Sequence, residues 1–235
     1  IKPAHFAIYN KFGLYIEKYW GLKSMPHTDD FEQTCDKLKF LLEDAISRQL
    51  VSDVPLCTFI SGGLDSSIIT KFAANYCKKH GLSPISTYSV DYVDNDKNFV
   101  KSDFQPNSDN YYIDLMIENT YSTNKKILLD TPELAKYLKD AMIARDLPGM
   151  ADVDSSLLLF CKNVKKEQTV TLMGECADEI FGGYPWFFRE DALNSGTFPW
   201  SIAIEERQQL LNSEIAKKVN LKEYIDFRYN ESLAE

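Results

Sequence analysis

The spacing of apolar residues along the chain predicts an alternation of strands and helices. Runs rich in β-branched and aromatic residues predict strands at 5–10, 14–20, 55–60, 85–90, 125–129 and 169–173. Apolar residues at helical spacing predict helices that begin near residues 29, 64, 111, 132 and 155. Strands that alternate with helices in this way are typical of βαβ units, so we expect an α/β fold with a parallel sheet.

The two ends of the chain differ from this central pattern. Residues 5–19 read as a β-hairpin with its turn at 11–13, followed by a linker at 21–28. Beyond residue 190 the pattern is polar and helical. We therefore expect three parts: a hairpin and linker at 1–28, the parallel-sheet domain at 29–190, and a helical extension at 191–235. The chain lacks an initiator methionine, and we expect it to be a piece of a longer protein.

Some details of the helices can also be predicted. Asp29 is a candidate N-cap for the first helix, with Glu32 three residues later. In the second helix we expect a buried stripe, and Gly81 stands where a C-terminal cap belongs. Residues 91–110, rich in Asp, Asn and Ser, read as a loop. The residues of the expected stripe are Ile68, Ile69, Phe72, Ala73 and Tyr76.

Composition narrows the possible partners and compartment. The formal net charge is −9, which argues against a long nucleic acid as partner, because phosphate contacts need clustered Lys and Arg. No apolar stretch approaches the length of a membrane span. The five cysteines are scattered, with no C-x-x-C pair, which favours free thiols in the cytoplasm.

Two unusual stretches follow predicted strands. The first, "FISGGLDSS" at 59–67, combines two glycines, three serines and one aspartate before a helix. Glycines allow backbone N–H groups to surround an anion, and the helix directs its partial positive end to the same place. The carboxylate of Asp65 would repel phosphate unless it holds a magnesium ion that bridges to the phosphate oxygens. The stretch therefore predicts a site for a polyphosphate and its metal.

This loop is neither a Walker A loop nor a G-x-G-x-x-G loop. It resembles the SGG-x-DSS loop of the PP-loop ATP pyrophosphatases, which split ATP between its α and β phosphates. The resemblance implies the parallel-sheet fold of the adenine nucleotide alpha hydrolases. A small-residue turn that merely closes a strand is the structural alternative.

The second stretch, "GECADEIFGGY" at 174–184, resembles the GEGADE-x-FGGY signature of glutamine-hydrolysing asparagine synthetases and the related β-lactam synthetases. "SDVP" at 52–55 and "RDLPGMADVDSS" at 145–156 also resemble that family, as does the opening hairpin, which is similar to the last hairpin of the family's glutaminase domain. Cys176 stands where the family usually has glycine, and Met173 where it often has serine.

The resemblance assigns roles residue by residue. It implies that Asp65 and Asp178 hold magnesium and pyrophosphate, and that Glu175 lies near the acyl phosphate as a base or charge partner for ammonia. Acidic residues in the first turn of a helix are also common as complements of the helix dipole, which is the alternative for Asp178 and Glu179. The residues implied to bind ATP are Ile60, Ser61, Gly62, Gly63, Asp65, Ser66, Ser67, Val90, Met173 and Gly174.

The reaction implied is adenylation of the side-chain carboxylate of aspartate by ATP, followed by attack of ammonia to give asparagine, AMP and pyrophosphate. The ammonia would come from a glutaminase domain that this sequence lacks, and the full-length protein could form a homodimer. The family's later basic segment is also missing, so we do not expect the chain to catalyse the reaction alone. The alternatives are an amidotransferase that adenylates another carboxylate, a tRNA-modifying PP-loop enzyme and a silent nucleotide-binding module.

Overall fold

The structure is a computed structural model that describes residues 1–101, 107–147 and 149–233. The chain divides into two compact units, residues 1–45 and residues 46–235, which are described separately. The division falls inside the first helix, α1 (Phe31–Gln49).

The first unit begins with the expected hairpin, which is confirmed. Strand β1 (His5–Asn10) pairs antiparallel with β2 (Gly13–Lys18). The turn is closed by Asn10, whose side-chain oxygen accepts a hydrogen bond of 2.8 Å from the backbone N–H of Phe12. Gly13 has a φ of +118°, a backbone conformation that glycine adopts with little strain.

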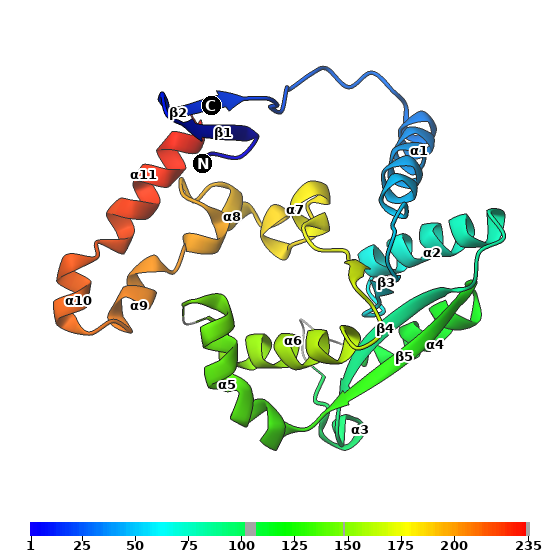
Figure 1. Ribbon diagram of the computed structural model, residues 1–235. Coiled ribbons are helices and arrows are strands. Elements are labelled where there is room, and N and C mark those ends of the chain that lie inside the picture. The colour runs from blue at the N-terminus through cyan, green and yellow to red at the C-terminus, as the bar shows by residue number, and fades with distance from the viewer. Residues whose placement is uncertain (102–106, 148, 234–235) are drawn as a thin grey trace. The chain divides into compact units, whose positions relative to one another are not determined.

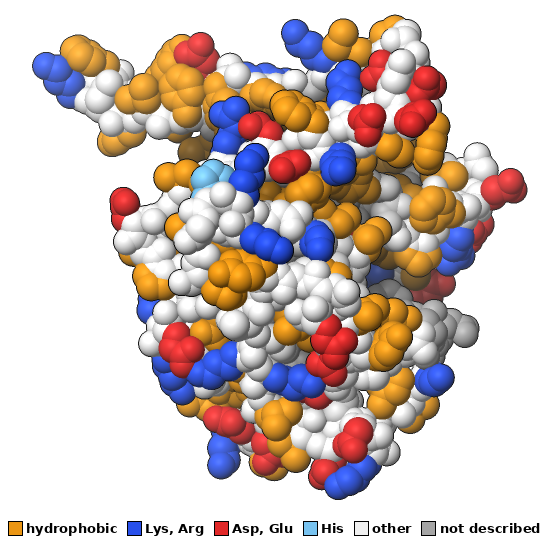
Figure 2. Space-filling model, turned by 90° about the vertical axis from the view of Figure 1, so that its right-hand side faces the viewer, with side chains coloured by type: hydrophobic (Ala, Val, Ile, Leu, Met, Phe, Trp, Pro, Cys, Tyr) orange, Lys and Arg blue, Asp and Glu red, His pale blue; other side chains and the backbone are white. Residues whose placement is uncertain are grey.

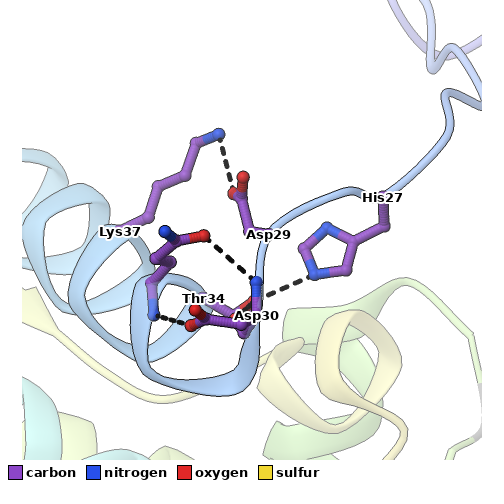
Figure 3. A network of polar contacts seen from close by, with 6 residues as sticks. His27, Asp29, Asp30, Thr34 and Lys37 are labelled. Carbon is purple, nitrogen blue, oxygen red and sulfur yellow. Dashed lines mark hydrogen bonds and ion pairs between the residues drawn. The ribbon is translucent and has the colours of Figure 1, made fainter.

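The start of α1 is capped one residue later than the sequence predicted. The carboxylate of Asp30 accepts from the backbone N–H of Gln33 at 2.9 Å, and the side chain of Gln33 accepts from the backbone N–H of Asp30 at 3.1 Å (Figure 3). This reciprocal pair is a capping box. Asp29, the expected cap, instead pairs with Lys37 at 3.3 Å. The prediction of Asp29 and Glu32 was therefore wrong by one position.

The second unit contains a four-stranded sheet in the order β5-β4-β3-β6 (Figure 1). Its strands are β3 (Leu56–Phe59), β4 (Ile85–Tyr92), β5 (Ser122–Leu129) and β6 (Val170–Leu172). All three neighbouring pairs are parallel, which confirms the predicted α/β fold. The chain runs outward from β3 to β5 and then returns to place β6 on the other side of β3. In such sheets ligands bind outside the carboxyl ends of the strands where the order reverses, here β3 and β6.

Alternate residues of β3 face two different layers of helices, which lie on opposite sides of the sheet (Figure 1). Cys57 and Phe59 pack in a cluster with residues of α5 (Thr131–Arg145) and α6 (Ala151–Val164). Leu56 packs with the cluster that contains Ala73 and Ala74 of α2 (Leu64–Lys79). Both faces are therefore covered, as is usual for a parallel sheet.

The buried face of α2 differs from the stripe that we expected. Of the five predicted residues only Ala73 is buried, and the larger side chains are half-buried. Small side chains let the helix approach the sheet closely, and the hydroxyls of Thr58 and Thr70 bond each other at 2.9 Å in that interface. The residues of α2 that are buried are Ser66, Thr70, Ala73, Ala74 and Cys77.

Gly81 ends α2 as predicted. It has a φ of +67°, its backbone N–H bonds the carbonyl of Lys78 at 3.3 Å, and that of Leu82 bonds the carbonyl of Cys77 at 2.9 Å. These are the two hydrogen bonds of a Schellman motif.

The segment at 91–110, which we expected to be a loop, contains the end of β4 and a short helix, α3 (Asn95–Asn98). Residues 102–106 of this segment lie outside the described residues. The next helix, α4 (Asn110–Glu118), agrees with the predicted helix at 111–121.

The described part of the chain after β6 forms helices, most of which are short. Tyr184 and Trp186 stack with ring centroids 4.3 Å apart, and none of the aromatic residues at 184–188 is fully buried. The helices are α7 (Ala177–Phe181), η1 (Pro185–Phe187), α8 (Glu190–Leu193), η2 (Pro199–Ser201), α9 (Ile204–Gln209), α10 (Ser213–Lys218) and α11 (Leu221–Leu233).

Two properties of the surface bear on the possible partners. Among the described residues, no helix combines the length and apolar character that a bilayer-spanning segment needs. On the face shown in Figure 2, Lys and Arg side chains lie interspersed with Asp and Glu and with apolar side chains. The charge on this face is therefore mixed.

Candidate active site

The two unusual stretches meet at one cavity. They follow β3 and β6, which are hydrogen-bonded neighbours with Thr58 opposite Leu172. A cavity of about 380 Å³ opens at their carboxyl ends. Ten of the residues singled out from the sequence line it: Ile60, Ser61, Gly63, Asp65, Ser66, Val90, Met173, Gly174, Glu175 and Asp178. Gly62 and Ser67, which the sequence also indicated, are not among the lining residues.

The loop after β3 is held in shape by its own serines. The hydroxyl groups of Ser61 and Ser66 are 3.0 Å apart, and the backbone N–H of Ser61 donates to the Ser66 hydroxyl at 3.2 Å. Ser66 in turn donates to the carbonyl of Gly63 at 3.2 Å. Ser66 is buried, so its hydroxyl group organises the loop from within.

Gly62 has a different role from the lining residues. Its φ is +78°, and a Cβ atom at this position would lie 2.8 Å from the carbonyl oxygen of Asp109 and 3.1 Å from the Cβ of Tyr112. The loop therefore rests against the start of α4, and a side chain at residue 62 would force the two apart.

Gly174 brings the other loop against the first turn of α2. A Cβ atom here would lie 2.9 Å from the Cβ of Asp65 and 3.1 Å from the backbone nitrogen of Ser66. Only a glycine permits this approach without a shift of the backbone. The two motifs, which lie far apart in the sequence, are thus in direct contact.

Asp65 and Asp178 form an acidic pair at the junction of the two loops. Partial burial and the negative charge of Asp178 raise the pKa of the Asp65 carboxyl above its ordinary value. The side chain of Asp178 packs against Gly183, where a Cβ atom would lie 1.9 Å from its Oδ1. Two carboxylates held together in this way repel each other, and a cation between them would relieve the repulsion.

The donor set suits a metal that is completed by substrate oxygens. Within the described ranges, no three His, Cys, Asp or Glu side chains are grouped so as to hold a metal ion. Magnesium commonly takes one or two protein carboxylates and fills its other positions with water and phosphate oxygens. The pair fits magnesium that arrives with a polyphosphate.

The loop between β6 and α7 contains a strained residue. Cys176 has a φ of +70° and a ψ of 4°, the left-handed conformation that residues with a Cβ atom rarely adopt. This position is the one at which the sequence departs from the glycine of the family pattern. The side chain of Cys176 is exposed and lines the cavity.

Tyr184 lines the cavity beside the acidic residues, although the sequence analysis gave this last residue of the second stretch no role in the site. Its hydroxyl donates to Glu179 at 3.2 Å. Burial, and next the negative charge of Glu179, raise the pKa of the Tyr184 hydroxyl. The sequence signal for this position was the glycine pair before it, Gly182 and Gly183, because the pair lets the chain turn back after α7. The other lining residues that we did not expect are Phe59, Asp109, Ile113, Leu157, Phe160 and Cys176.

The segment at 145–156 precedes and begins α6, two of whose residues line the cavity. Arg145 pairs with Asp154 at 2.7 Å, and only 9% of the Asp154 side chain is exposed. The hydroxyls of Tyr92 and Ser156 are 2.7 Å apart. These contacts connect the start of α6 to the end of α5 and to β4. Residue 148, part of the resemblance in this segment, lies outside the described residues.

A parallel sheet with a glycine- and serine-rich loop, a following helix and an acidic pair where the strand order reverses defines a nucleotide-binding α/β domain of the PP-loop type. The family model described as asparagine synthase matches residues 37–235. The chain belongs to the asparagine synthase family.

Individual relatives agree with this assignment. The chain is 52% identical, over all of its 235 residues, to asparagine synthetase [glutamine-hydrolyzing] 3 of Bacillus subtilis, of which it covers 38%. It is 26% identical over 184 residues, 77% of its length, to asparagine synthetase [glutamine-hydrolyzing] 1 of the same organism, of which it covers 26%. It is also 25% identical over 212 residues, 85% of its length, to amidase chyE of Penicillium rubens, covering 30% of that protein. The chain therefore spans well under half the length of these relatives.

Proposed function

We propose that this chain is the synthetase part of a glutamine-dependent asparagine synthetase. In the proposed reaction, an oxygen of the aspartate side-chain carboxylate attacks the α-phosphorus of ATP. The bond to the β-phosphate breaks and pyrophosphate leaves. Ammonia then attacks the activated carbonyl carbon and loses a proton, AMP leaves, and asparagine is formed.

The loop at 60–67 is proposed to bind the leaving pyrophosphate. The hydroxyl groups of Ser61 and Ser66 fix the shape of the loop, and α2 begins directly behind it. Preorganised donors of this kind stabilise negative charge as it develops in the transition state, because they need no reorganisation. The proposed nucleotide contacts outside the loop are Val90, Met173 and Gly174, which line the same cavity.

Asp65 and Asp178 are proposed to hold magnesium. The support is the pKa of Asp65, which burial and next the negative charge of Asp178 raise, and the place of both residues beside the phosphate loop. When bound, magnesium would neutralise charge on the phosphate oxygens and orient them. The two carboxylates supply the ligands from the protein, and Gly183 leaves room for that of Asp178.

Glu175 is proposed to act at the acceptor end of the cavity. It lines the cavity one residue after Gly174, which contacts the helix behind the phosphates. A carboxylate at this place could attract ammonium or accept a proton from ammonia as it attacks. Part of the cavity wall is apolar and is formed by Phe59, Ile113 and Phe160. An apolar wall suits this reaction because ammonia must reach the activated carbonyl before water does.

The rest of the assignment is proposed from the family. Residues 1–28 would be the end of a glutaminase domain that supplies ammonia, residues 29–190 the synthetase domain, and residues 191–235 the start of a helical extension. We propose a cytoplasmic enzyme of asparagine biosynthesis that uses ATP and magnesium, with a homodimer as one possible assembly of the full-length protein.

One observation carries this proposal: the loops after β3 and β6 contact each other through Gly174 and Asp65 and line one cavity. The first experiment is titration of the chain with ATP and magnesium by calorimetry. The second is pyrophosphate release by the protein in its natural full length, with ammonium and a panel of amino acids.

We expect aspartate to give the signal, and Asp65→Asn and Asp178→Asn each to reduce it roughly 100-fold or more. Asp140→Asn removes the same charge from an exposed site on α5 and should have no effect. A signal with another acid would assign the acceptor to a different carboxylate. Binding without pyrophosphate release would leave a silent nucleotide-binding module, and a gel shift with tRNA would indicate a modifying enzyme.

A further inference from the structure

Asp91, at the end of β4, is the centre of a polar cluster that the proposed reaction does not use. One carboxylate oxygen accepts from the backbone N–H of Tyr92 and from the side-chain amide of Asn95, both at 2.8 Å. The other oxygen accepts from the side-chain amide of Asn110 at 2.8 Å. Burial would raise the pKa of Asp91, but the hydrogen bonds, that from Asn110 first among them, together with the nearby Lys126 hold it below its ordinary value. Asp91 is therefore a carboxylate at neutral pH.

The three donors come from three elements. Tyr92 ends β4, Asn95 is the first residue of α3, and Asn110 is the first residue of α4. Asp91 and Asn110 are 19 residues apart in the sequence. A single carboxylate thus ties both ends of the segment between β4 and α4 to the carboxyl end of the sheet.

The start of α4 is part of the wall of the cavity. Asp109 and Ile113 line the cavity, and so does Val90, the residue before Asp91. A Cβ atom on Gly62 would lie only 2.8 Å from the carbonyl oxygen of Asp109. The carboxylate of Asp91 is therefore connected through Asn110 to the backbone that supports the phosphate loop.

We propose that Asp91 is a positioning residue for nucleotide binding, which holds the start of α4 against the loop at 61–63. This inference rests on the proposed function for the identity of the nucleotide. In this proposal Asp91 does not contact the reacting atoms. Its effect should appear in the affinity for ATP more than in the affinity for the acceptor acid, because Glu175, the residue proposed for the acceptor end, follows β6 and not β4.

The test is an exchange of partners between Asp91 and Asn110. Asp91→Asn replaces one accepting oxygen with an NH2 group, while the side-chain amides of Asn95 and Asn110 still both act as donors. One hydrogen bond is therefore lost. Asn110→Asp places two carboxylates face to face. The double variant Asp91→Asn with Asn110→Asp restores a donor opposite an acceptor. We expect each single variant to weaken ATP binding on the order of tenfold, and the double variant to recover most of that loss.

Asp94→Asn is the matched control. It removes the same charge from the same segment, where Asp94 pairs at the surface with Lys97 at 2.6 Å. Its ATP affinity should equal that of the unaltered chain. In the full-length protein, the KM for ATP should rise in the single variants while the KM for aspartate stays within about twofold.

Hydrogen exchange gives a readout that does not require nucleotide. The backbone N–H of Ile113, which bonds the carbonyl of Asp109 at 3.0 Å, should exchange faster in the single variants and return toward normal in the double variant. Unchanged exchange and unchanged ATP affinity in Asp91→Asn would overturn the inference, as would failure of the double variant to recover. If the unaltered chain does not bind ATP, the proposed function itself is overturned.

Discussion

Gly174 lies against Asp65 so closely that a Cβ atom on the glycine would be 2.9 Å from the Cβ of the aspartate. The two residues follow different strands, β6 and β3, and their contact joins the two motifs of the candidate site. Several predictions of stability and binding depend on contacts of this kind.

Gly174→Ala should damage both folding and binding. The added methyl group meets backbone of the first turn of α2, which cannot move as a side chain could. We expect a loss of about 1–3 kcal/mol in the free energy of unfolding, and a weaker affinity for ATP because the loops must separate. Urea unfolding and calorimetry measure the two effects.

The control for this variant is Gly81→Ala. Gly81 has a φ of +67° with open space around it, so alanine there adds backbone strain of about 1 kcal/mol at a place remote from the cavity. ATP affinity should be unchanged in Gly81→Ala. Normal ATP affinity in Gly174→Ala would contradict the contact between the loops.

Asp65→Asn should stabilise the chain when magnesium and nucleotide are absent. The pKa of Asp65 is raised in the folded state by burial and by Asp178. Ionisation of such a group disfavours folding, so the cost is fully present above the folded pKa and is absent below the unfolded one. The gain in Tm of Asp65→Asn should therefore be present at pH 7 and disappear as the pH falls through the raised pKa toward the ordinary value.

The same variant should bind ATP with magnesium poorly, which distinguishes a functional pair from a structural one. Asp140→Asn serves again as the charge-matched control and should show neither effect. A Tm for Asp65→Asn that lies below that of the unaltered chain at pH 7 would contradict the cost of ionising Asp65 in the folded state.

Thr58 and Thr70 should show strong energetic coupling. Both side chains are fully buried between β3 and α2, and their hydroxyls bond each other. Thr70→Val leaves the Thr58 hydroxyl without this partner, at a cost of about 1–3 kcal/mol. The double variant Thr58→Val with Thr70→Val should be less destabilised than the sum of the two single variants. Simple additivity in urea unfolding would show that the pair is not coupled.

Cys176→Gly should stabilise the chain by about 1 kcal/mol, because it relieves the left-handed conformation at φ +70°. Cys176→Ala keeps the strain and removes the thiol, so its stability should be close to that of the unaltered chain. Both variants should retain pyrophosphate release. Loss of activity in Cys176→Ala alone would give the thiol a role that we do not expect.

Much of the fold could be predicted from the sequence because the apolar spacing is local. The hairpin and the four strands of the sheet lie where the pattern predicted them. The face of α2 was predicted wrongly, because periodicity groups residues by face and favours large apolar side chains, whereas close packing on the sheet selected Ser66, Thr70 and Ala74. The cap of α1 was displaced because Asp29 and Asp30 are both good caps, and the pairing of Lys37 with Asp29 leaves Asp30 to bond Gln33.

The sequence by itself determined the chemistry of each loop: glycines and serines before a helix, and acidic residues after a strand. It determined this because turn conformation and helix starts depend on residues only a few positions apart. Only the tertiary structure decided that β6 lies beside β3, that Gly174 contacts Asp65, and that Asp91 reaches Asn110. These relationships depend on the order of strands in the sheet and on packing between distant segments, which the spacing of residues along the chain does not encode.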